Sequence, residues 1–588
     1  MKYLKTTHWT DLPNQQGLLF FAQILNEALF DYTLDTYKTQ ALNIRLLCIE
    51  ALQTIDNIKL GLIKKPNIES VIDELLWSLN GDFVAKELVG TKLSGIIEKI
   101  NSNRNNLKNL KEVIQLLYHY LDDKKYLNHI QIKLNRLVPE NKEKGNIYKA
   151  TKSFVTELVS YGYTTSYIYH NANRFFFNYA ESFSQTTPKT FFEIFNYKEK
   201  TFTVVYKVSK LFKEFESLSE TLNFKIQEKY STKNLSGDEK KFISNINTSE
   251  TFIVFENVEA FDDNVARIMT EIPLFKIGNL FSFYHHKEVP KISTLALVTN
   301  HSDKFSLLRE QPIKSIIKKA DTNPKTAALK AKNLFSTLNL PPETIYRISR
   351  AIDLHSISLT TEQVENKLIN LWTSLETLIP KDIDCGDDRI IQIIKALLPF
   401  QTLKYINKLI EQAGNDFSYF DSENSKKLIK ATVLKDSENS FHALSALIMT
   451  VENETIRTQV YDLLNNYPLL RFRLFTLNKT LSNGKEVVKL IEIHRQKVEW
   501  QIRRIYRVRN LIVHSGKMPS YTNILVENLH NYFDDFLNYV IDNAIRDKRI
   551  RTINEAILNA EIDVNTLINN IKSIGDNAIT LDNYKKIL

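Results

Sequence analysis

Hydrophobic residues recur at helical spacing along the first third of the chain. Between positions 17 and 180, apolar side chains return every three or four residues, which is the pattern of helices with one buried face. The stretches 42–58 and 107–121 show it most clearly. An aromatic cluster at 161–179 ends the region, and it fits either core packing, which we favour, or a recognition surface that stacks bases or grips a protein. We therefore predict a helical N-terminal region over residues 1–190.

The hydrophobic period changes to two after residue 190. Alternating segments rich in β-branched and aromatic side chains indicate strands, and they lie at 201–208, 252–255 and 292–298. A helical pattern at 207–229 follows the first of them. These elements predict a small mixed α/β module over residues 191–330.

From residue 331 onward the pattern is again helical. Pro341 and Pro342 favour the start of a helix, and Pro380 ends the one predicted at 361–379. Further helices are predicted near 388–412, 455–482, 485–514, 520–547 and 551–586. We expect a helical bundle over 331–550 and a helical tail over 551–588, which makes the protein mainly α.

Composition supports a helical protein in a reducing compartment. The 588 residues include only 14 glycines and 14 prolines, so few tight turns are available to connect short strands. Two cysteines, Cys48 and Cys385, exclude a disulfide framework and a cysteine-based zinc site. The early apolar run at 17–22 continues at helical spacing, which favours a buried helix over a signal peptide. No stretch approaches the roughly 18 apolar residues of a membrane span, so we expect a cytoplasmic protein without a membrane partner.

Positive charge is concentrated near the end of the chain. The net charge is +9, and between positions 484 and 518 nine basic side chains stand against three acidic ones. Such a concentration favours a polyanionic partner, nucleic acid before membrane, although a solvated helix face would also carry it.

Several enzyme classes find no support in the sequence. Neither a phosphate-binding loop of the Walker type nor a Gly-x-Gly-x-x-Gly turn nor a Gly-x-Ser-x-Gly elbow occurs. No two histidines stand four apart, and the adjacent His285 and His286 point away from each other in any regular structure. We therefore predict no cofactor and no metal.

The basic helix at 485–514 carries a candidate site on one face. Wound at 100° per residue, Ile505, Val508 and Ile512 form its buried stripe. The opposite side collects polar side chains, namely Gln496, Glu499, Arg503, Arg507, Asn510 and His514. Arg509 lies beside the apolar stripe, and Gly516 is a suitable C-cap. Histidine exchanges protons near neutral pH, so this face can combine phosphate binding with acid–base chemistry.

The residues Arg509-Asn510-Leu511-Ile512-Val513-His514-Ser515-Gly516 resemble the Arg-Asn-x-x-x-His signature of the HEPN ribonuclease superfamily. The segment 371–378, which includes Trp372 and Glu376, resembles the Trp-x-x-Leu-Glu helix of the Apea-like HEPN branch. The resemblance covers about 335–550. It implies a helical bundle that dimerises and cleaves RNA without a metal, and a role as a toxin or antiviral effector.

This resemblance and the charge together define the predicted site. Arg509, Asn510 and His514 are the predicted catalytic residues, and Glu376 is the predicted acid that orients Arg509. The residues expected to bind RNA phosphates are Arg503, Arg504, Arg507 and Lys517. A second Arg-x-x-x-x-His match, Arg350 to His355, lacks the asparagine, the glycine and the basic face, and we interpret it as structural.

Three functions remain open from the sequence. The favoured one is an RNA endonuclease, acting as a homodimer on tRNA or another structured RNA and controlled by a phage or cellular trigger that binds the N-terminal region. The second is a non-catalytic RNA-binding or sensor protein. The third is a helical scaffold whose basic face meets an acidic protein.

Overall fold

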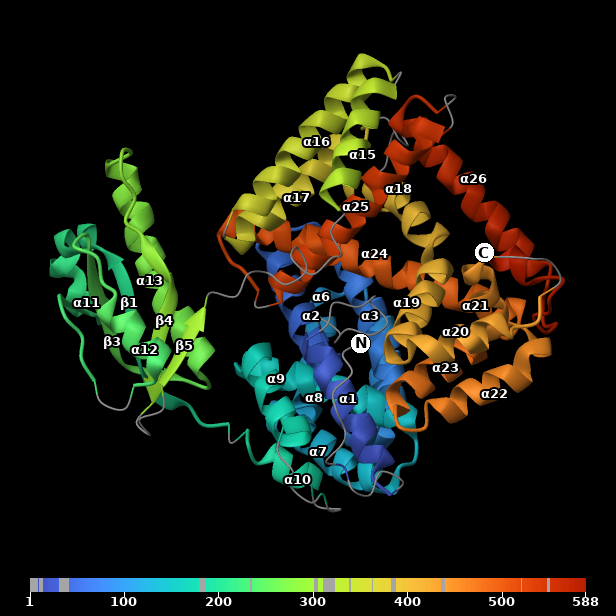
Figure 1. Cartoon of the computed structure of the whole chain (residues 1–588), viewed down its shortest axis with the longest axis horizontal. Helices are drawn as coiled ribbons and strands as arrows, with labels where there is room; N and C mark the ends of the chain where they lie inside the picture. Colours follow the sequence, from blue (N-terminus) through green and yellow to red (C-terminus); the bar gives the residue numbers. More distant parts are fainter. Residues whose placement is uncertain are drawn as a thin grey trace.

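The computed structural model describes residues 9, 14–30, 42–178, 183, 187–195, 197–232, 235–300, 305–309, 323–337, 340–361, 363–381, 388–434, 439–519, 521–546 and 550–588. Helices dominate both ends of the chain, and a small antiparallel sheet lies between them in the sequence, as predicted (Figure 1). Within these residues, no helix combines the length and apolar character needed to cross a bilayer.

The N-terminal region is a helical unit with its own core, coloured blue to cyan in Figure 1. Its buried residues come from every α-helix of the region, and they include Tyr163 and Phe176 of the aromatic cluster, so the core-packing interpretation of that cluster is confirmed for these side chains. The elements are α1 (Gln16–Phe30), α2 (Ile44–Lys59), α3 (Asn67–Gly81), α4 (Phe83–Val89), η1 (Gly90–Lys92), α5 (Leu93–Ser102), α6 (Leu107–Tyr120), α7 (Asp123–Glu140), α8 (Lys144–Tyr161), α9 (Thr165–Asn173), η2 (Arg174–Asn178) and α10 (Thr187–Phe192).

The middle module is a five-stranded antiparallel sheet in the order β2-β3-β1-β4-β5. The central strand alternates between two cores, because Tyr206 faces the side covered by α13 whereas its neighbour Val205 packs on the opposite side with Phe242 of α12. The predicted strands match β1, β3 and β4. The elements are β1 (Lys200–Ser209), η3 (Lys210–Leu218), α11 (Ser219–Leu222), β2 (Lys225–Gln227), α12 (Gly237–Ser244), β3 (Glu250–Ala260), α13 (Asp263–Tyr284), β4 (Ile292–Asn300) and β5 (Phe305–Arg309).

The predicted helix at 207–229 is partly wrong. Its last residues form the edge strand β2, which pairs with β3 through Ile226 and Ile253. Pairing with a neighbouring strand overrides the local helical pattern at this short edge. The module stands to one side of the helices in Figure 1, and Asp262 links it to them by accepting hydrogen bonds from the Thr164 backbone at 2.6 Å and hydroxyl at 3.1 Å.

The C-terminal helices form two cores, and the long helix α24 takes part in both. One core is built from α16, α17, α18, α25 and the second half of α24, and the other from α19 to α23 and the first half of α24. The elements are α15 (Pro324–Thr337), α16 (Pro342–Thr360), α17 (Val364–Leu378), α18 (Arg389–Leu403), α19 (Tyr405–Phe420), α20 (Ser422–Lys430), α21 (Ser440–Met449), η4 (Val451–Asn453), α22 (Glu454–Leu463), α23 (Pro468–Thr480), α24 (Gly484–Ser515), α25 (Thr522–Arg546), α26 (Ile553–Lys572) and η5 (Tyr584–Ile587).

Residues 551–588 are not a separate tail. Ile557 of α26 is buried in the first core, and Ile571 and Ile587 are buried in the second. Gly484 shows how closely this segment packs, because a Cβ atom there would lie 2.5 Å from the Ile571 carbonyl oxygen. The predicted boundary at 551 therefore divides elements that share two hydrophobic cores.

The N-terminal helices pack directly against α23 and α24, which lie beside them in Figure 1. Phe472 of α23 contacts the ring of Phe20, with centroids 5.2 Å apart. The carboxylate of Glu27 lies 2.6 Å from Arg473, and both side chains are almost fully buried. Buried charges of this kind are found where two surfaces stay together, because separating them would leave each charge without its partner.

Candidate active site

Helix α24 runs from its N-cap at Asn483 to a glycine cap at Gly516. The Asn483 side chain accepts a hydrogen bond from the Glu486 backbone at 2.9 Å. At the other end, Gly516 adopts φ 64° and its backbone N–H donates to the Ile512 carbonyl at 2.9 Å. Glycine is favoured in this left-handed conformation because it has no Cβ. The predicted helix and its predicted C-cap are both confirmed.

The apolar stripe of α24 is buried, as predicted, in the core that also contains α17. Ile505, Val508 and Ile512 all belong to the first C-terminal core, together with the fully buried Trp372. The indole of Trp372 lies 5.7 Å from the Tyr506 ring, measured between centroids. This contact between α17 and α24 determines which residues of the two helices face each other.

Arg509, Asn510 and Glu376 lie together at this contact. A guanidinium nitrogen of Arg509 donates to the Asn510 side-chain oxygen at 3.0 Å, and the other terminal nitrogen lies 3.7 Å from a Glu376 carboxylate oxygen. Arg509 and Glu376 are each 26% exposed, so the pair is reached by solvent. Glu376, the acid predicted to orient Arg509, therefore lies beside it.

The end of α17 that carries Glu376 is tied down by a second arginine. Arg389 of α18 donates to the backbone carbonyl oxygens of Glu376 at 2.8 Å, Ile379 at 2.6 Å and Pro380 at 2.9 Å. The last carbonyl groups of a helix have no partner inside the helix, so a cation that binds them stabilises that helix end. Nothing in the local sequence links Arg389 to α17, so its role was not predicted.

His514 and Lys517 lie on open surface at the end of α24. Both are exposed, and so are the apolar neighbours Val513 at 48% and Met518 at 43%. His514 stands four residues after Asn510, so the two share one side of the helix. Arg509, Asn510 and His514 therefore all lie in the last two turns of α24, with Glu376 beside Arg509 and the histidine exposed.

Arg504 and Arg507 do not belong to an RNA-binding face in this structure, which corrects two of the predicted phosphate ligands. Both are buried, and both bind Glu50 of α2: Arg504 donates to its two oxygens at 2.9 Å, and Arg507 donates to one at 2.8 Å. Arg504 also lies 2.5 Å from Glu74 of α3, and Arg507 donates to the Ser70 hydroxyl at 3.1 Å. The polar face of α24 is covered here by the N-terminal helices, which helical periodicity alone does not reveal.

The electrostatics of this cluster follow from its burial. Burial alone would raise the pKa of the Glu50 carboxyl, but Arg504 and Arg507 outweigh that effect and lower it to about 2. Burial raises the pKa of Glu74, with Glu50 adding to the effect and Arg504 opposing it. Glu50 is therefore the ionised centre that holds the two arginines.

The remaining predicted phosphate ligand, Arg503, is partly occupied on its own helix. It is 22% exposed and pairs with Glu499 one turn earlier, with nitrogen–oxygen distances of 2.8 and 2.9 Å. A surface pair of this kind contributes little and can be exchanged for another anion. Lys517 and Arg503 are thus the two phosphate-binding predictions that remain accessible.

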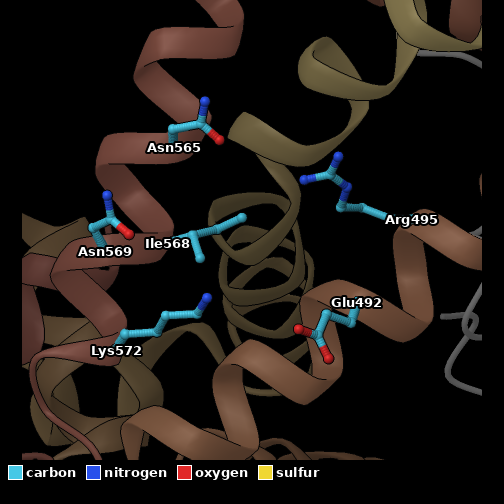
Figure 2. Close-up of a pocket in the computed structure, with 6 residues that line it drawn as sticks. All are labelled: Glu492, Arg495, Asn565, Ile568, Asn569 and Lys572. Atoms are coloured by element: carbon cyan, nitrogen blue, oxygen red, sulfur yellow. The ribbon is translucent and has the colours of Figure 1, made fainter.

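A further basic hollow opens between α24 and α26. It has a volume of about 610 Å³ and is lined by Glu492, Arg495, Asn565, Ile568, Asn569 and Lys572. Figure 2 shows Arg495 and Lys572 pointing into it from opposite helices. Arg495 belongs to the basic segment, whereas Lys572 lies far away in the sequence, in the predicted tail, so the sequence does not reveal that both line this hollow.

A cavity of about 470 Å³ lies where the N-terminal helices meet α24. Its wall includes Arg504 and two tryptophans, Trp77 of α3 and Trp500 of α24. The centroids of the two indole rings are 5.7 Å apart. The Lys497 ammonium lies 4.9 Å from the centre of the Trp77 ring. A molecule bound in this cavity would contact both the N-terminal region and α24.

Comparisons with known proteins find no match for this chain among protein-family models, curated proteins or solved structures.

Proposed function

We propose that the protein is a metal-independent RNA endonuclease of the HEPN type. One observation carries the proposal: the accessible His514 ends a helix on which Arg509 is held by Asn510 and by Glu376 of a neighbouring helix. An imidazole that moves protons beside an oriented guanidinium is the combination that phosphodiester cleavage requires. The exposed or partly exposed basic side chains of Arg503, Lys517, Arg495 and Lys572 support an RNA substrate.

The proposed chemistry uses the 2′-hydroxyl of RNA as the nucleophile. Its oxygen attacks the adjacent phosphorus and loses its proton to a base, while the bond to the 5′-oxygen breaks and that oxygen gains a proton. The products are a 2′,3′-cyclic phosphate and a 5′-hydroxyl. His514 supplies proton transfer at its imidazole, and Arg509 stabilises the extra negative charge on the phosphate oxygens. DNA lacks the 2′-hydroxyl, so it binds by charge and is not cut.

We propose that the working unit is a homodimer, because one chain places a single histidine at this end of α24. The surface of α16 offers a place for a second copy. Ile345, Ile352 and Leu359, spaced seven residues apart, are 43%, 36% and 41% exposed and form one apolar stripe. Ile352→Glu should give a monomer by analytical ultracentrifugation and lose cleavage, whereas Leu116→Glu on α6 should change neither. A monomer that cleaves RNA at full specific activity would contradict this part of the proposal.

We propose that the N-terminal region restrains this nuclease, as expected of a toxin or antiviral effector that waits for a trigger. The buried bonds from Glu50 to Arg504 and Arg507 connect that region to the helix that carries Arg509 and His514. The cavity beside Trp77 and Trp500 lies at the same contact, so a trigger bound there would act on α24 directly.

The decisive experiment is RNA cleavage in EDTA by the purified full chain and its variants. Total cellular RNA is expected to yield fragments ending in 2′,3′-cyclic phosphate. His514→Ala should lower the rate by about 10²- to 10⁴-fold, the usual loss for an acid–base group, and His119→Ala, an exposed histidine of α6, should have no effect. Circular dichroism in the same buffer separates loss of chemistry from loss of fold. Equal rates in the two variants, or cleavage of an all-DNA strand, would refute the proposal.

The main alternative is an RNA-binding protein without catalysis. The burial of Arg504 and Arg507 favours it, because fewer cations remain near Arg509 to hold the scissile phosphate. In that case RNA binding would weaken with salt and no fragments would appear. A scaffold for an acidic protein would show no salt-sensitive RNA binding at all.

A further inference from the structure

Two histidines and an aspartate meet where α16 and α25 come together. His355 belongs to α16, whereas His530 and Asp534 stand four residues apart on α25. The distance from His355 Nε2 to Asp534 Oδ1 is 3.7 Å, and that from His530 Nδ1 to Asp534 Oδ2 is 3.5 Å. One nitrogen of each histidine and one aspartate oxygen all lie within 4.8 Å of one another.

The two histidine–aspartate separations are close to those of ligands around a single metal ion, and the two imidazole nitrogens lie within 4.8 Å of each other. Zinc binds imidazole nitrogen and carboxylate oxygen at about 2.0–2.1 Å in a tetrahedral arrangement, which places neighbouring ligand atoms roughly 3.3 Å apart. The two distances to Asp534 exceed this value by only a few tenths of an ångström. Small side-chain rotations would therefore bring all three donors to bonding distance of one ion.

The surroundings hold the donors in place and shield them from water. The His355 ring lies parallel to the Phe533 ring, with centroids 5.0 Å apart and an angle of 13° between the planes. Phe533 is buried in the first C-terminal core, so the plane of His355 is fixed by that core. The side chains of His355, His530 and Asp534 are 19%, 7% and 19% exposed, so the cluster is largely shielded from solvent.

We propose that His355, His530 and Asp534 bind one divalent transition-metal ion and so join α16 to α25. Two imidazoles and one carboxylate are the donor set of zinc and similar ions, whereas magnesium and calcium prefer oxygen alone. The ion stabilises the contact between two helices that also carry the proposed dimer stripe and the first core. It takes no part in the RNA chemistry, which we assign to Arg509 and His514.

The sequence hides this site because its members are far apart in the chain. His355 lies in the segment 350–355, which we interpreted as structural, and no spacing rule connects it to His530. Asp534 stands one turn after His530, but a histidine and an aspartate at that spacing usually form a simple surface pair. Only the packing of α16 beside α25 brings the three together, and the proposal departs from the prediction of no metal.

The test is metal binding by the full chain after treatment with a chelator and removal of that chelator. Zinc chloride titrated in a calorimeter should bind once per chain with a dissociation constant of 1 µM or lower, and magnesium chloride should not bind at that site. Cobalt chloride should give visible absorption bands of a four- or five-coordinate site. Zinc should also raise the melting temperature. These measurements do not involve RNA, so their outcome is independent of the proposed nuclease activity.

Variants of the three ligands decide whether the site is the one proposed. Asp534→Asn keeps the size of the side chain and should weaken zinc binding at least tenfold, and His355→Ala should do the same or more. His119→Ala, a histidine outside the cluster, should leave the affinity unchanged. The absence of stoichiometric zinc binding to the wild-type chain at 10 µM, or unchanged affinity in both ligand variants, would overturn the proposal.

Discussion

Glu50 is the residue on which the contact between the N-terminal region and α24 depends most. Its carboxylate accepts bonds from Arg504 at 2.9 Å on both oxygens and from Arg507 at 2.8 Å, and all three side chains are at most 7% exposed. The change Glu50→Gln removes the negative charge while keeping the size of the side chain. Two buried guanidinium groups then keep Glu74, Gln501 and Ser70 as partners, and Glu74 is the one carboxylate among these three.

Two independent arguments give the size of the effect. Removing one member of a buried ion pair costs about 3–5 kcal/mol, because the other charge stays buried without compensation. The pKa of Glu50 falls from the ordinary 4.5 to about 2. Each pKa unit is worth about 1.4 kcal/mol, so the contact favours the ionised carboxylate over the protonated one by about 3 kcal/mol. We therefore expect Glu50→Gln to lower the free energy of separating α2 from α24 by about 3 kcal/mol.

The pKa of Glu50 also predicts how this contact depends on pH. Because the folded pKa lies below the ordinary value, the ionised carboxylate stabilises the contact fully above about pH 4.5, and this contribution is lost as the pH falls toward 2. Glu74, whose pKa is raised, acts in the opposite direction and offsets part of the change. When the pH is lowered from 4.5 to 3, the wild type should therefore lose more of the free energy that holds α2 against α24 than the Glu50→Gln variant does.

Amide hydrogen exchange measures this contact without requiring the whole chain to unfold in one step. Protection of the amides in α2 and in residues 500–508 of α24 should fall by about 100-fold in Glu50→Gln. The control is Glu87→Gln, because Glu87 is 46% exposed and pairs with Lys133 at the surface, where such a pair is worth less than about 1 kcal/mol. Protection of α24 within fivefold of the wild type in Glu50→Gln would refute the view that these ion pairs hold the contact.

Three further outcomes follow from the site and the helix ends. Glu376→Gln should lower RNA cleavage by about tenfold with little change in melting temperature, because Arg509 loses the carboxylate that orients it; unchanged cleavage would remove Glu376 from the site. Gly516→Ala should destabilise the end of α24 by about 1 kcal/mol, since φ is 64° there, whereas Gly95→Ala, at an exposed helical position of α5 with open space around it, should be neutral or stabilising in a thermal melt. Trp77→Ala should increase exchange in residues 497–504 of α24, because Trp500 and Lys497 lose the ring they contact; exchange equal to the wild type would contradict this.

Much of the secondary structure was predictable because its signals are local. The apolar stripe of α24, its glycine cap and the strands β1, β3 and β4 all appear as patterns within a few residues of one another. The edge strand β2 was missed because three residues carry too little pattern, and it exists only because β3 lies beside it. The helix α13, which covers one face of the sheet, was also missed.

In the candidate site, too, some features follow from the sequence and others depend on the tertiary structure. The order of Arg509, Asn510, His514 and Gly516 along one helix end follows from the sequence and from 3.6 residues per turn alone. Helical periodicity places Arg507 on a polar face, but it does not say whether that face meets water or another part of the chain. In the structure Glu50, far away in the sequence, meets it, and the arginine becomes buried.

The amino-acid sequence by itself therefore determined that both ends of the chain are helical, where α24 ends and which of its side chains share a face. The tertiary structure decided which polar faces are open, which are closed by a partner from elsewhere in the chain, and that His355, His530 and Asp534 come together. The physical reason is the distance along the sequence over which each interaction acts. Backbone hydrogen bonds and side-chain spacing within a helix act over a few residues, whereas burial of a charge depends on elements that the chain brings together only when it folds.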